Sequence, residues 1–300
     1  MKNHKLSKLL LALVVSGLAM PTLGQLEEVV VTASKRAENL QDIPQAVTAF
    51  SSERLVELGI VETSDLMGAI PNIQVTSAYG RTQPNFSIRG ISVANEFSAA
   101  TASPVGVYVD EVYQSFRASH GQQLFDLESV EVLRGPQGTL YGRNTTGGAV
   151  NVNTIKPSLD EGMSGFLNAR LGNYSYTDFT GAVEATIIPG ELGVRLSGAV
   201  SEADGYVDNT LLGTDHPQTS STAGRLSVLW RPSDKTDIHA KVYWAENDPR
   251  QDIAFGAGYL EGGANATGVP LIASPDMESV ASDTSGVYFT CLLYTSPSPR

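Results

Sequence analysis

The sequence has few of the residues on which disulfide, metal and nucleic-acid chemistry depend. One cysteine in 300 residues excludes a disulfide framework and a multi-cysteine zinc site, and four scattered histidines show no metal cluster. Lysine and arginine number 20 against 32 acidic residues, whereas nucleic-acid binding needs clustered positive charge. Charged residues make up only 17% of the chain. A soluble globular protein typically has about 25%. We therefore expect no nucleic-acid partner.

Long hydrophobic runs are also missing. No stretch reaches about 18 apolar residues, so no membrane-spanning helix is expected. The apolar run at residues 9–19 follows three lysines within the first eight residues, which is the pattern of a signal peptide. Small residues at Thr22 and Gly24 predict cleavage before Gln25. We assign residues 1–24 to a signal peptide, and the exported chain can still cross a membrane as a β-barrel.

Signatures of catalysis are absent as well. No Gly-x-Ser-x-Gly sequence occurs, and no histidine lies close in sequence to a plausible nucleophile. Residues 142–147 have the glycine spacing of a phosphate-binding loop, but residues 148–149 are Gly-Ala where that loop needs Lys and Ser or Thr. We expect no catalytic residue, no cofactor and no bound metal.

Two acidic pairs remain as candidates for acid–base chemistry. They are Asp110 with Glu111, and Asp126 with Glu128. Neighbouring acids at the junction of a strand and a loop are usually solvated, so we interpret both pairs as surface residues. The histidines at positions 120, 216 and 239 are interpreted as loop or lumen residues rather than as metal ligands.

Residues 43–157 combine helical and strand patterns, which predicts one α+β domain. Helices are expected at 51–59, with a serine cap and a glycine stop, and at 63–70, just before Pro71. Short β-type runs are found at 45–50, 86–89, 105–109, 130–133 and 149–155. Residues 25–42, ahead of this domain, are assigned to a tether.

From residue 163 to about residue 290, apolar and polar side chains alternate as they do in strands with one apolar face. We expect strands at 163–172, 176–187, 192–200, 225–231 and 236–244, with a sixth near 286–293. Runs of about 9–12 residues match strands that cross a bilayer, whereas strands in soluble sheets average about 5–6. The pattern favours a transmembrane antiparallel β-barrel over a secreted β-sandwich.

The alternation also assigns each side chain to a face of the sheet. We expect Phe179, Val183, Leu226, Val228, Ile238 and Val242 to face lipid, and Asp178, Glu184, Arg225, Asp237 and Lys241 to face the lumen. Tight turns at 188–191 and 232–235 alternate with long polar connections at 204–220 and 247–285. Outer-membrane barrels have long loops outside and short turns in the periplasm.

Six strands cannot close a barrel, which needs at least about 8 in a single bacterial chain. Open strand edges in lipid are not tolerated, so we interpret the chain as the first part of a longer protein. Residues 291–300 lose the alternation and contain two prolines and the only cysteine. We hypothesise that these ten residues are a sequencing or assembly artefact.

Several short motifs occur in a recognisable order. Glu-Val-Val-Val-Thr-Ala at residues 28–33 resembles the TonB box of TonB-dependent outer-membrane receptors. The domain that follows resembles their plug domain, because it contains Phe-Ser-Ile-Arg-Gly at 86–90, Glu-Val-Leu-Arg-Gly-Pro at 131–136 and Gly-Thr-Leu-Tyr-Gly at 138–142. The resemblance is dense over residues 27–157 and looser over the strands after them.

This resemblance implies energy-coupled uptake across the outer membrane of a Gram-negative bacterium, through a barrel of 22 strands filled by the plug. It implies a contact with the periplasmic TonB complex through Glu28, Val29, Val30, Val31, Thr32 and Ala33. The plug-motif residues would be Arg89, Gly90, Glu131, Arg134, Gly135 and Gly142, with the two arginines reaching carboxylates of the barrel wall. The family's commonest ligand is an iron–siderophore complex, with saccharides and cobalamin as alternatives.

Two rival classes are compatible with parts of the pattern. A secreted adhesin or structural β-protein would have the α/β domain as an accessory, and a periplasmic hydrolase would use it for catalysis. Neither class has a reason to place an extended β-prone segment directly after a signal-peptide cleavage site. The tether therefore favours a receptor that pairs with a partner by adding a strand to the partner's sheet.

Overall fold

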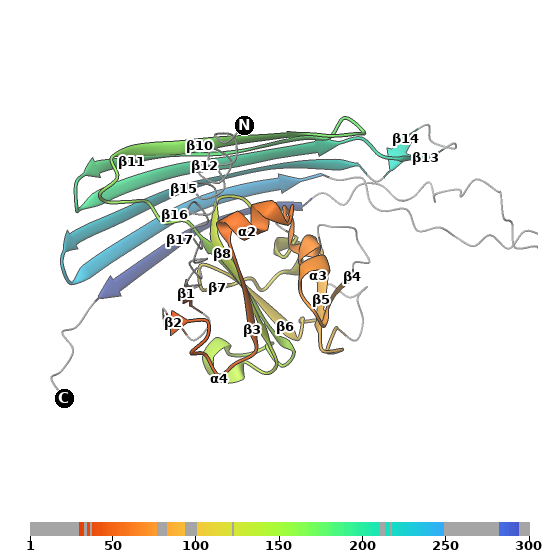
Figure 1. The fold of residues 1–300 in the computed structure, drawn as a ribbon, viewed down its shortest axis with the longest axis horizontal. Coiled ribbons are helices and arrows are strands. Elements are labelled where there is room, and N and C mark those ends of the chain that lie inside the picture. Colours follow the sequence, from red (N-terminus) through yellow and green to blue (C-terminus); the bar gives the residue numbers. More distant parts are fainter. Residues whose placement is uncertain are drawn as a thin grey trace, which may run out of the picture.

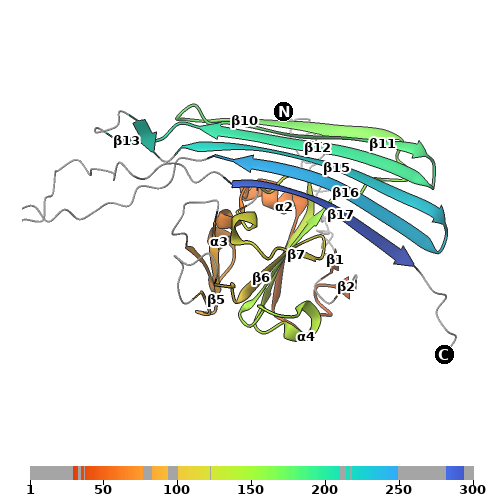
Figure 2. The same cartoon turned by 180° about the vertical axis from the view of Figure 1, so that it is seen from behind.

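A computed structural model of the chain describes residues 30–32, 35–36, 38–76, 83–93, 101–121, 123–209, 214–216, 218–248 and 282–293. The assigned signal peptide, Glu28, Val29 and Ala33 lie outside the described residues. A curved six-stranded sheet, the wall sheet, arches over a smaller α+β unit, the N-terminal unit (Figure 1). Seen from behind, the N-terminal unit again lies on the concave side of the wall sheet (Figure 2).

A five-stranded sheet forms the centre of the N-terminal unit. Its strands, in spatial order, are β3 (Val47–Ser51), β8 (Leu127–Arg134), β9 (Gly148–Thr154), β6 (Val105–Val109) and β7 (Val112–Tyr113). The pair β6–β9 runs parallel, and the other neighbouring pairs run antiparallel. The predicted α+β class is confirmed.

Short helices and two small hairpins surround this sheet. They are α2 (Ser52–Glu57), α3 (Leu66–Ala69), α4 (Gly138–Tyr141), the 3-10 turns η1 (Thr63–Asp65) and η2 (Arg117–Ser119), and the strand pairs β1 (Val30–Val31) with β2 (Glu38–Asn39) and β4 (Ile73–Thr76) with β5 (Asn85–Ile88). In the described part of the chain, none of these helices has the length and apolar character needed to span a membrane.

The two predicted helices differ in outcome. The helix expected at 51–59 is confirmed as α2, where Ser51 Oγ accepts from the Arg54 N–H (3.4 Å). The helix expected at 63–70 is instead divided into η1 and α3. Its first turn is tighter because Asp65 Oδ2 reaches back to accept from the Glu62 N–H (2.9 Å).

Both faces of the five-stranded sheet are covered. The elements α2, α3 and the β4–β5 hairpin cover one face, where Leu66, Phe86 and Val132 are buried. The tether covers the other face together with α4, and there Val31 and Leu133 are fully buried. Successive residues of a strand point to opposite faces, so β8 contributes to both clusters. The tether is thus part of the packed unit.

The wall sheet contains six antiparallel strands. In spatial and chain order they are β10 (Met163–Leu171), β11 (Thr177–Ile188), β12 (Leu192–Ala203), β15 (Thr219–Ser233), β16 (Thr236–Asn247) and β17 (Ser282–Leu293). A small hairpin, β13 (Val207–Asn209) with β14 (Thr214–His216), follows β12. The sheet is open, with β10 and β17 at its edges.

Several strand ends differ from the sequence prediction, and the largest differences are at the starts of β15 and β17. β15 begins at Thr219, six residues early, because residues 219–222 pair with β12, and Ser221 and Thr222 also pair with β16, although these residues lack apolar alternation. β17 begins at Ser282, four residues before the expected start, and ends at Leu293 as expected, so its pairing with β16 includes Cys291. Residues 294–300 lie outside the described residues.

The predicted faces of the wall sheet are those of the structure. Facing the N-terminal unit, Asp178, Glu184, Arg225 and Lys241 are buried. Facing away, Phe179, Val183, Leu226 and Val242 remain between 39% and 47% exposed. The register also places Val228 and Ile238 outward and Asp237 inward. Trp244 lies outward across its partner Gly224, where an added Cβ would collide with the indole ring.

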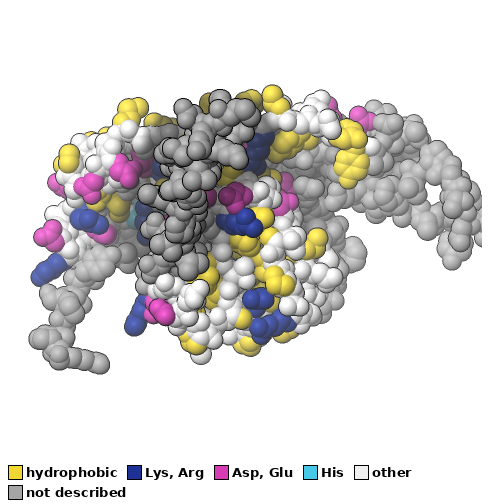
Figure 3. Space-filling view, in the orientation of Figure 1, with side chains coloured by type: hydrophobic (Ala, Val, Ile, Leu, Met, Phe, Trp, Pro, Cys, Tyr) yellow, Lys and Arg dark blue, Asp and Glu magenta, His cyan; other side chains and the backbone are white. Residues whose placement is uncertain are grey.

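The two ends of the wall sheet differ in their connections. Short turns join β11 to β12 and β15 to β16 at one end, and the long connections after β12 and β16 leave the other end. Figure 3 shows charged side chains at the short-turn end, where Arg231 and Asp237 form an ion pair (2.6 Å). This asymmetry predicts which end faces the medium.

Cysteine labelling of the full-length protein in intact cells tests this topology. In a Cys291→Ser background, Asp215→Cys in β14 is expected to react with a membrane-impermeant maleimide. Ser233→Cys, in a short turn, is expected to react only after the outer membrane is permeabilised. The reverse pattern would mean that the strand order is inverted relative to the membrane.

Candidate functional site between the N-terminal unit and the wall sheet

The carboxylate of Asp126 is the central contact between the two units. Asp126 precedes β8 in the left-handed backbone region (φ 52°), and its side chain is 1% exposed. Arg195 of β12 donates to it through Nη2 (2.6 Å) and Nε (3.1 and 3.2 Å). Arg225 of β15 donates to the Asp126 side chain (3.4 Å) and main-chain oxygen (2.9 Å). One acid therefore binds two strands of the wall.

A second carboxylate balances the charge of this cluster. Glu184 of β11 accepts from Arg195 Nη1 (2.8 Å), so Arg195 lies between two acids. Ser164 of β10 also donates to Glu184 (2.8 Å). The Arg225 guanidinium lies 4.7 Å from the centre of the Phe125 ring. Two acids and two arginines thus form a buried, neutral network that joins Asp126 to three strands of the wall sheet, and Ser164 extends it to β10.

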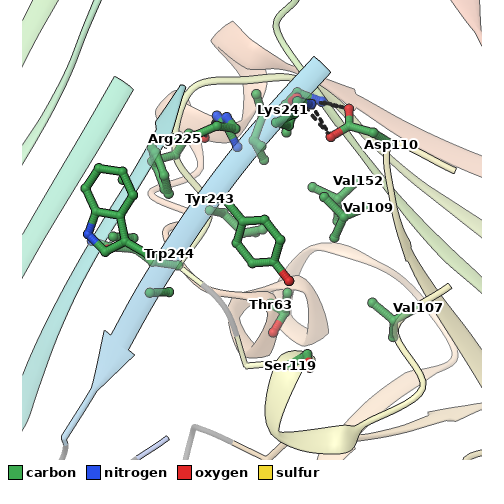
Figure 4. Close-up of a pocket in the computed structure, with 18 of the residues that line it drawn as sticks. Thr63, Val107, Val109, Asp110, Ser119, Val152, Arg225, Lys241, Tyr243 and Trp244 are labelled. Atoms are coloured by element: carbon green, nitrogen blue, oxygen red, sulfur yellow. Dashed lines mark hydrogen bonds and ion pairs between the residues drawn. The ribbon is translucent and has the colours of Figure 1, made fainter. Parts of the chain in front are cut away.

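A separate ion pair joins the units farther along the wall sheet. Lys241 of β16 donates to Asp110 Oδ2 (2.5 Å) and to the hydroxyl of Thr154 (Figure 4). Asp110 also accepts from the Thr154 N–H (2.9 Å), which ties the end of β9 to the residue after β6. Both Asp110 and Asp126 lie at the ends of strands of the N-terminal unit that meet the wall.

Two cavities lie along the same interface. One of about 40 Å³ lies between the N-terminal unit and β16, and Figure 4 shows Tyr243 pointing into it toward Thr63. The other, of about 240 Å³, is lined by α2 and by polar residues of β10 and β11, among them Asn168 and Asp178. The interface is therefore tightly bonded at Asp126 and incompletely filled on both sides of it.

His120 lies buried beside the smaller cavity. Its Nε2 lies 3.0 Å from the Gln114 carbonyl oxygen, and its Nδ1 has no hydrogen-bond partner within the described residues. Burial lowers the pKa of His120 from 6.5 to about 4, the Gln114 bond opposes this shift, and the Arg117 charge adds to it. The ring is therefore neutral at physiological pH.

The tether packs against the face of the five-stranded sheet that α2 and α3 do not cover. Thr32 contacts Glu131 of β8, and Val31 packs among Tyr141, Leu133 and Ala149. Burial raises the pKa of the Tyr141 hydroxyl, and the nearby Glu131 carboxylate raises it further. Of the six residues predicted to contact TonB, the structure describes Val30 (backbone only), Val31 and Thr32.

The predicted plug-motif residues form two groups. Arg89 (φ 54°) and Gly90 (φ 79°) make a turn, and Gly135 (φ 110°) would place a Cβ 3.2 Å from Arg89 Nη1. Arg134 lies next to Gly135 in sequence, and its buried Nε has no partner within the described residues. Among those residues neither arginine forms an ion pair, so their predicted carboxylate partners remain a prediction. Gly142 (φ 80°) ends α4, and Glu131 contacts Thr32 of the tether.

The interpretation of the acidic pairs as solvated surface is wrong for Asp110 and Asp126. Their neighbours Glu111 and Glu128 are exposed, but both aspartates are withdrawn from solvent by cations of the wall sheet. A signal was present: Arg225 and Lys241 were assigned to the lumen face, where a buried cation needs an acidic partner. His120 lies in the turn after η2, as the loop interpretation expected, and its side chain is buried.

Comparison with known proteins agrees with both units. A family model described as the TonB-dependent receptor plug domain matches residues 39–149. The pesticin receptor of Yersinia pestis is 29% identical over 234 residues, which cover 74% of this chain and 34% of that receptor. The chain thus spans about a third of the length of this relative.

Two solved structures are similar over most of the chain. The ferric yersiniabactin uptake receptor FyuA of Yersinia pestis has a TM-score of 0.61 at 26% identity, covering 68% of this chain and 32% of its own. The ferripyoverdine receptor of the Pseudomonas aeruginosa outer membrane has a TM-score of 0.72 at 17% identity, covering 88% of this chain and 34% of its own. The second likeness shows the fold alone.

Removing the central carboxylate tests the Asp126 network. Asp126→Asn leaves Arg225 buried without an acidic partner, which is expected to destabilise the interface by about 3 kcal/mol. Calorimetry of the full-length protein in detergent should show a lower unfolding midpoint for the N-terminal unit. Glu161→Gln, at an exposed carboxylate, is the control and should leave the midpoint unchanged. Equal midpoints for both variants would show that the network contributes nothing.

His120 predicts a pH dependence of stability. Because its folded pKa is about 4 and its unfolded value 6.5, the unfolded chain binds more protons between these values. Its contribution to stability is complete above pH 6.5 and is lost as the pH falls toward 4, a change of about 3 kcal/mol. Unfolding measured from pH 7 to pH 4 should show this decline. His120→Gln should flatten it, and an unaltered profile would contradict the assignment.

Proposed function

We propose, on the premise that the chain belongs to the TonB-dependent receptors, that it imports a scarce ligand across the outer membrane with energy supplied through TonB. The observation that carries the proposal is the contact between the N-terminal unit and the inward face of the wall sheet. This unit matches the plug family and is bonded through Asp126 and Asp110 to the polar face of a sheet whose other face is apolar. A wall with one apolar face and a plugged polar lumen is typical of large outer-membrane barrels.

The outward face of the wall sheet supports a position in the membrane. Leu196 and Leu226 form a cross-strand pair, and both side chains are exposed. Phe179 and Val183, on the neighbouring strand β11, are exposed as well. Exposed tryptophans lie toward the two ends of the strands, Trp230 near a short turn and Trp244 near a long connection. Aromatic residues at both interfaces are typical of membrane barrels.

The chemistry of the interface supports a plug that can move. Its charges cancel within the network, and its apolar contact is a small cluster in which Phe125 packs against alanines of the wall sheet. The cavities beside Asp126 leave unfilled space between the plug and the wall. Such an interface seals the lumen, yet it can open when a small number of ion pairs is broken.

For the partner, we propose that Glu28, Val29, Val30, Val31, Thr32 and Ala33 pair with the periplasmic part of TonB. The sequence of this segment has high β-propensity, and β1 already pairs with β2 as a strand. An extended segment that adds itself to a partner's sheet binds mainly through its backbone. The pairing therefore requires an intact N–H ladder along the segment.

For the ligand, we propose an iron–siderophore complex. The similar structure at 26% identity is named for ferric yersiniabactin uptake, and the resemblance described in the sequence analysis implies the same class of ligand. The test is uptake of radioactive iron by cells that carry the full-length receptor, with and without TonB. Uptake that requires both TonB and a ferric siderophore supports the proposal. TonB-dependent uptake of cobalamin or a saccharide instead would replace the ligand, and localisation outside the outer membrane would overturn the function.

A proline in the tether tests the TonB contact. Val30→Pro removes a backbone donor and restricts φ, so strand pairing with TonB should fail. Uptake is expected to fall to the level of cells without TonB, while ligand binding to whole cells stays unchanged. Val30→Ala keeps the N–H group and should transport normally. Normal uptake by the proline variant would place the TonB contact elsewhere.

A further inference from the structure

Glu131 is a fully buried carboxylate without a cationic partner. Its exposed fraction is 0%, and among the residues that the structure describes no Lys or Arg lies within ion-pair distance of it. A buried charge of this kind depends on hydrogen-bond donors that point at it. The identity of those donors is therefore informative.

The tether supplies the shortest of these bonds. The Thr32 N–H donates to Glu131 Oε1 (2.7 Å), and the Thr32 hydroxyl donates to the same oxygen (3.1 Å). Two amides of β9 complete the shell, Asn153 on Oε1 (3.1 Å) and Asn151 on Oε2 (3.3 Å). Both amides also bond to the Thr32 hydroxyl (3.2 and 3.3 Å). Thr32 thus lies at the centre of a polar cluster of the plug.

Neighbouring contacts hold the same segment. Val31 is fully buried on the sheet face beside Thr32. Three residues farther on, Lys35 lies over the ring of Tyr141 (4.5 Å) and near Glu111 (3.6 Å). If the segment leaves its position on the plug, Glu131 loses two of its four donors and Val31 becomes exposed. The segment therefore has two alternative states, one bound to the plug through Glu131 and one paired with a partner's sheet.

We propose that Glu131 is a positioning residue for the TonB-contact segment, because its carboxylate holds Thr32 against the plug and so limits the fraction of molecules that can bind TonB. The inference rests on the proposed function, since it takes residues 28–33 as the TonB contact. A partner that binds only the released segment has its apparent affinity reduced by the released fraction. Weakening the Glu131–Thr32 bonds should therefore strengthen binding of TonB.

The test titrates the full-length, ligand-free receptor in detergent with the periplasmic part of TonB. Glu131→Gln removes the charge but keeps the size of the side chain, and hydrogen bonds to a charged acceptor are about twice as strong as neutral ones. The apparent Kd for TonB is expected to fall about tenfold. Glu128→Gln, an exposed carboxylate on the same strand, is the matched control and should bind TonB like the natural receptor.

A second pair of variants keeps the test independent of folding at position 131. Thr32→Val removes the hydroxyl and should also lower the apparent Kd, whereas Thr32→Ser keeps both donors and should not. Combining Glu131→Gln with Thr32→Val should give less than the product of the two effects, because both variants break the same contact. Trypsin cleavage after Lys35 and Arg36 should accelerate in the variants with lower Kd.

The outcomes separate the two proposals. If the natural receptor binds TonB and Glu131→Gln and Thr32→Val bind it no more tightly, the positioning role is wrong and the proposed function stands. A variant that binds TonB more weakly, with a lower unfolding midpoint, also overturns the role, because Glu131 would then only support the plug. If neither the natural receptor nor any variant binds TonB, the proposed function itself fails.

Discussion

The ion pair between Asp126 and Arg195 is the contact on which the arrangement of the two units depends. It places the start of β8 against β12, and through Arg225 and Glu184 it reaches the strands on both sides of β12. The acids balance the arginines, so the plug meets the wall without a net buried charge. The outward face of the wall sheet is apolar and exposed, because its charged side chains face inward.

One strand connects the two functional ends of the plug. β8 begins next to Asp126, which is bound to the wall, and carries Glu131 five residues later, which holds the tether. The neighbouring strand β9 repeats the arrangement, since Asn151 and Asn153 contact Thr32 and Thr154 belongs to the Asp110–Lys241 contact. A force applied to the tether therefore acts on the two strands whose ends are bonded to the wall. This geometry connects the tether directly to the contacts between the two units.

Much of the fold followed from local pattern. Alternation of two residues is a property of the extended backbone, so Phe179, Val183 and Leu226 could be assigned to the outward face before any contact was known. Strand ends were less predictable, because the Ser and Thr residues at the start of β15 lack alternation and are ordered by pairing with β12 and β16. The helix expected at 63–70 differs for another reason, because the Asp65 carboxylate caps the Glu62 N–H and tightens the first turn into a 3-10 turn followed by one helical turn.

The sequence by itself determined the succession of an α+β unit and alternating strands, the sidedness of those strands and the resemblance to a plug, because all three depend on residue order. Only the tertiary structure decided which acids are buried and what they bind. Asp110 and Lys241 are 131 residues apart, and Thr32 and Glu131 are 99 apart. No spacing in the chain indicates such pairs, because they form only when separate strands pack together. The sequence predicted Asp126 to be on the surface, whereas in the structure Arg195 of β12 and Arg225 of β15 bind its buried carboxylate.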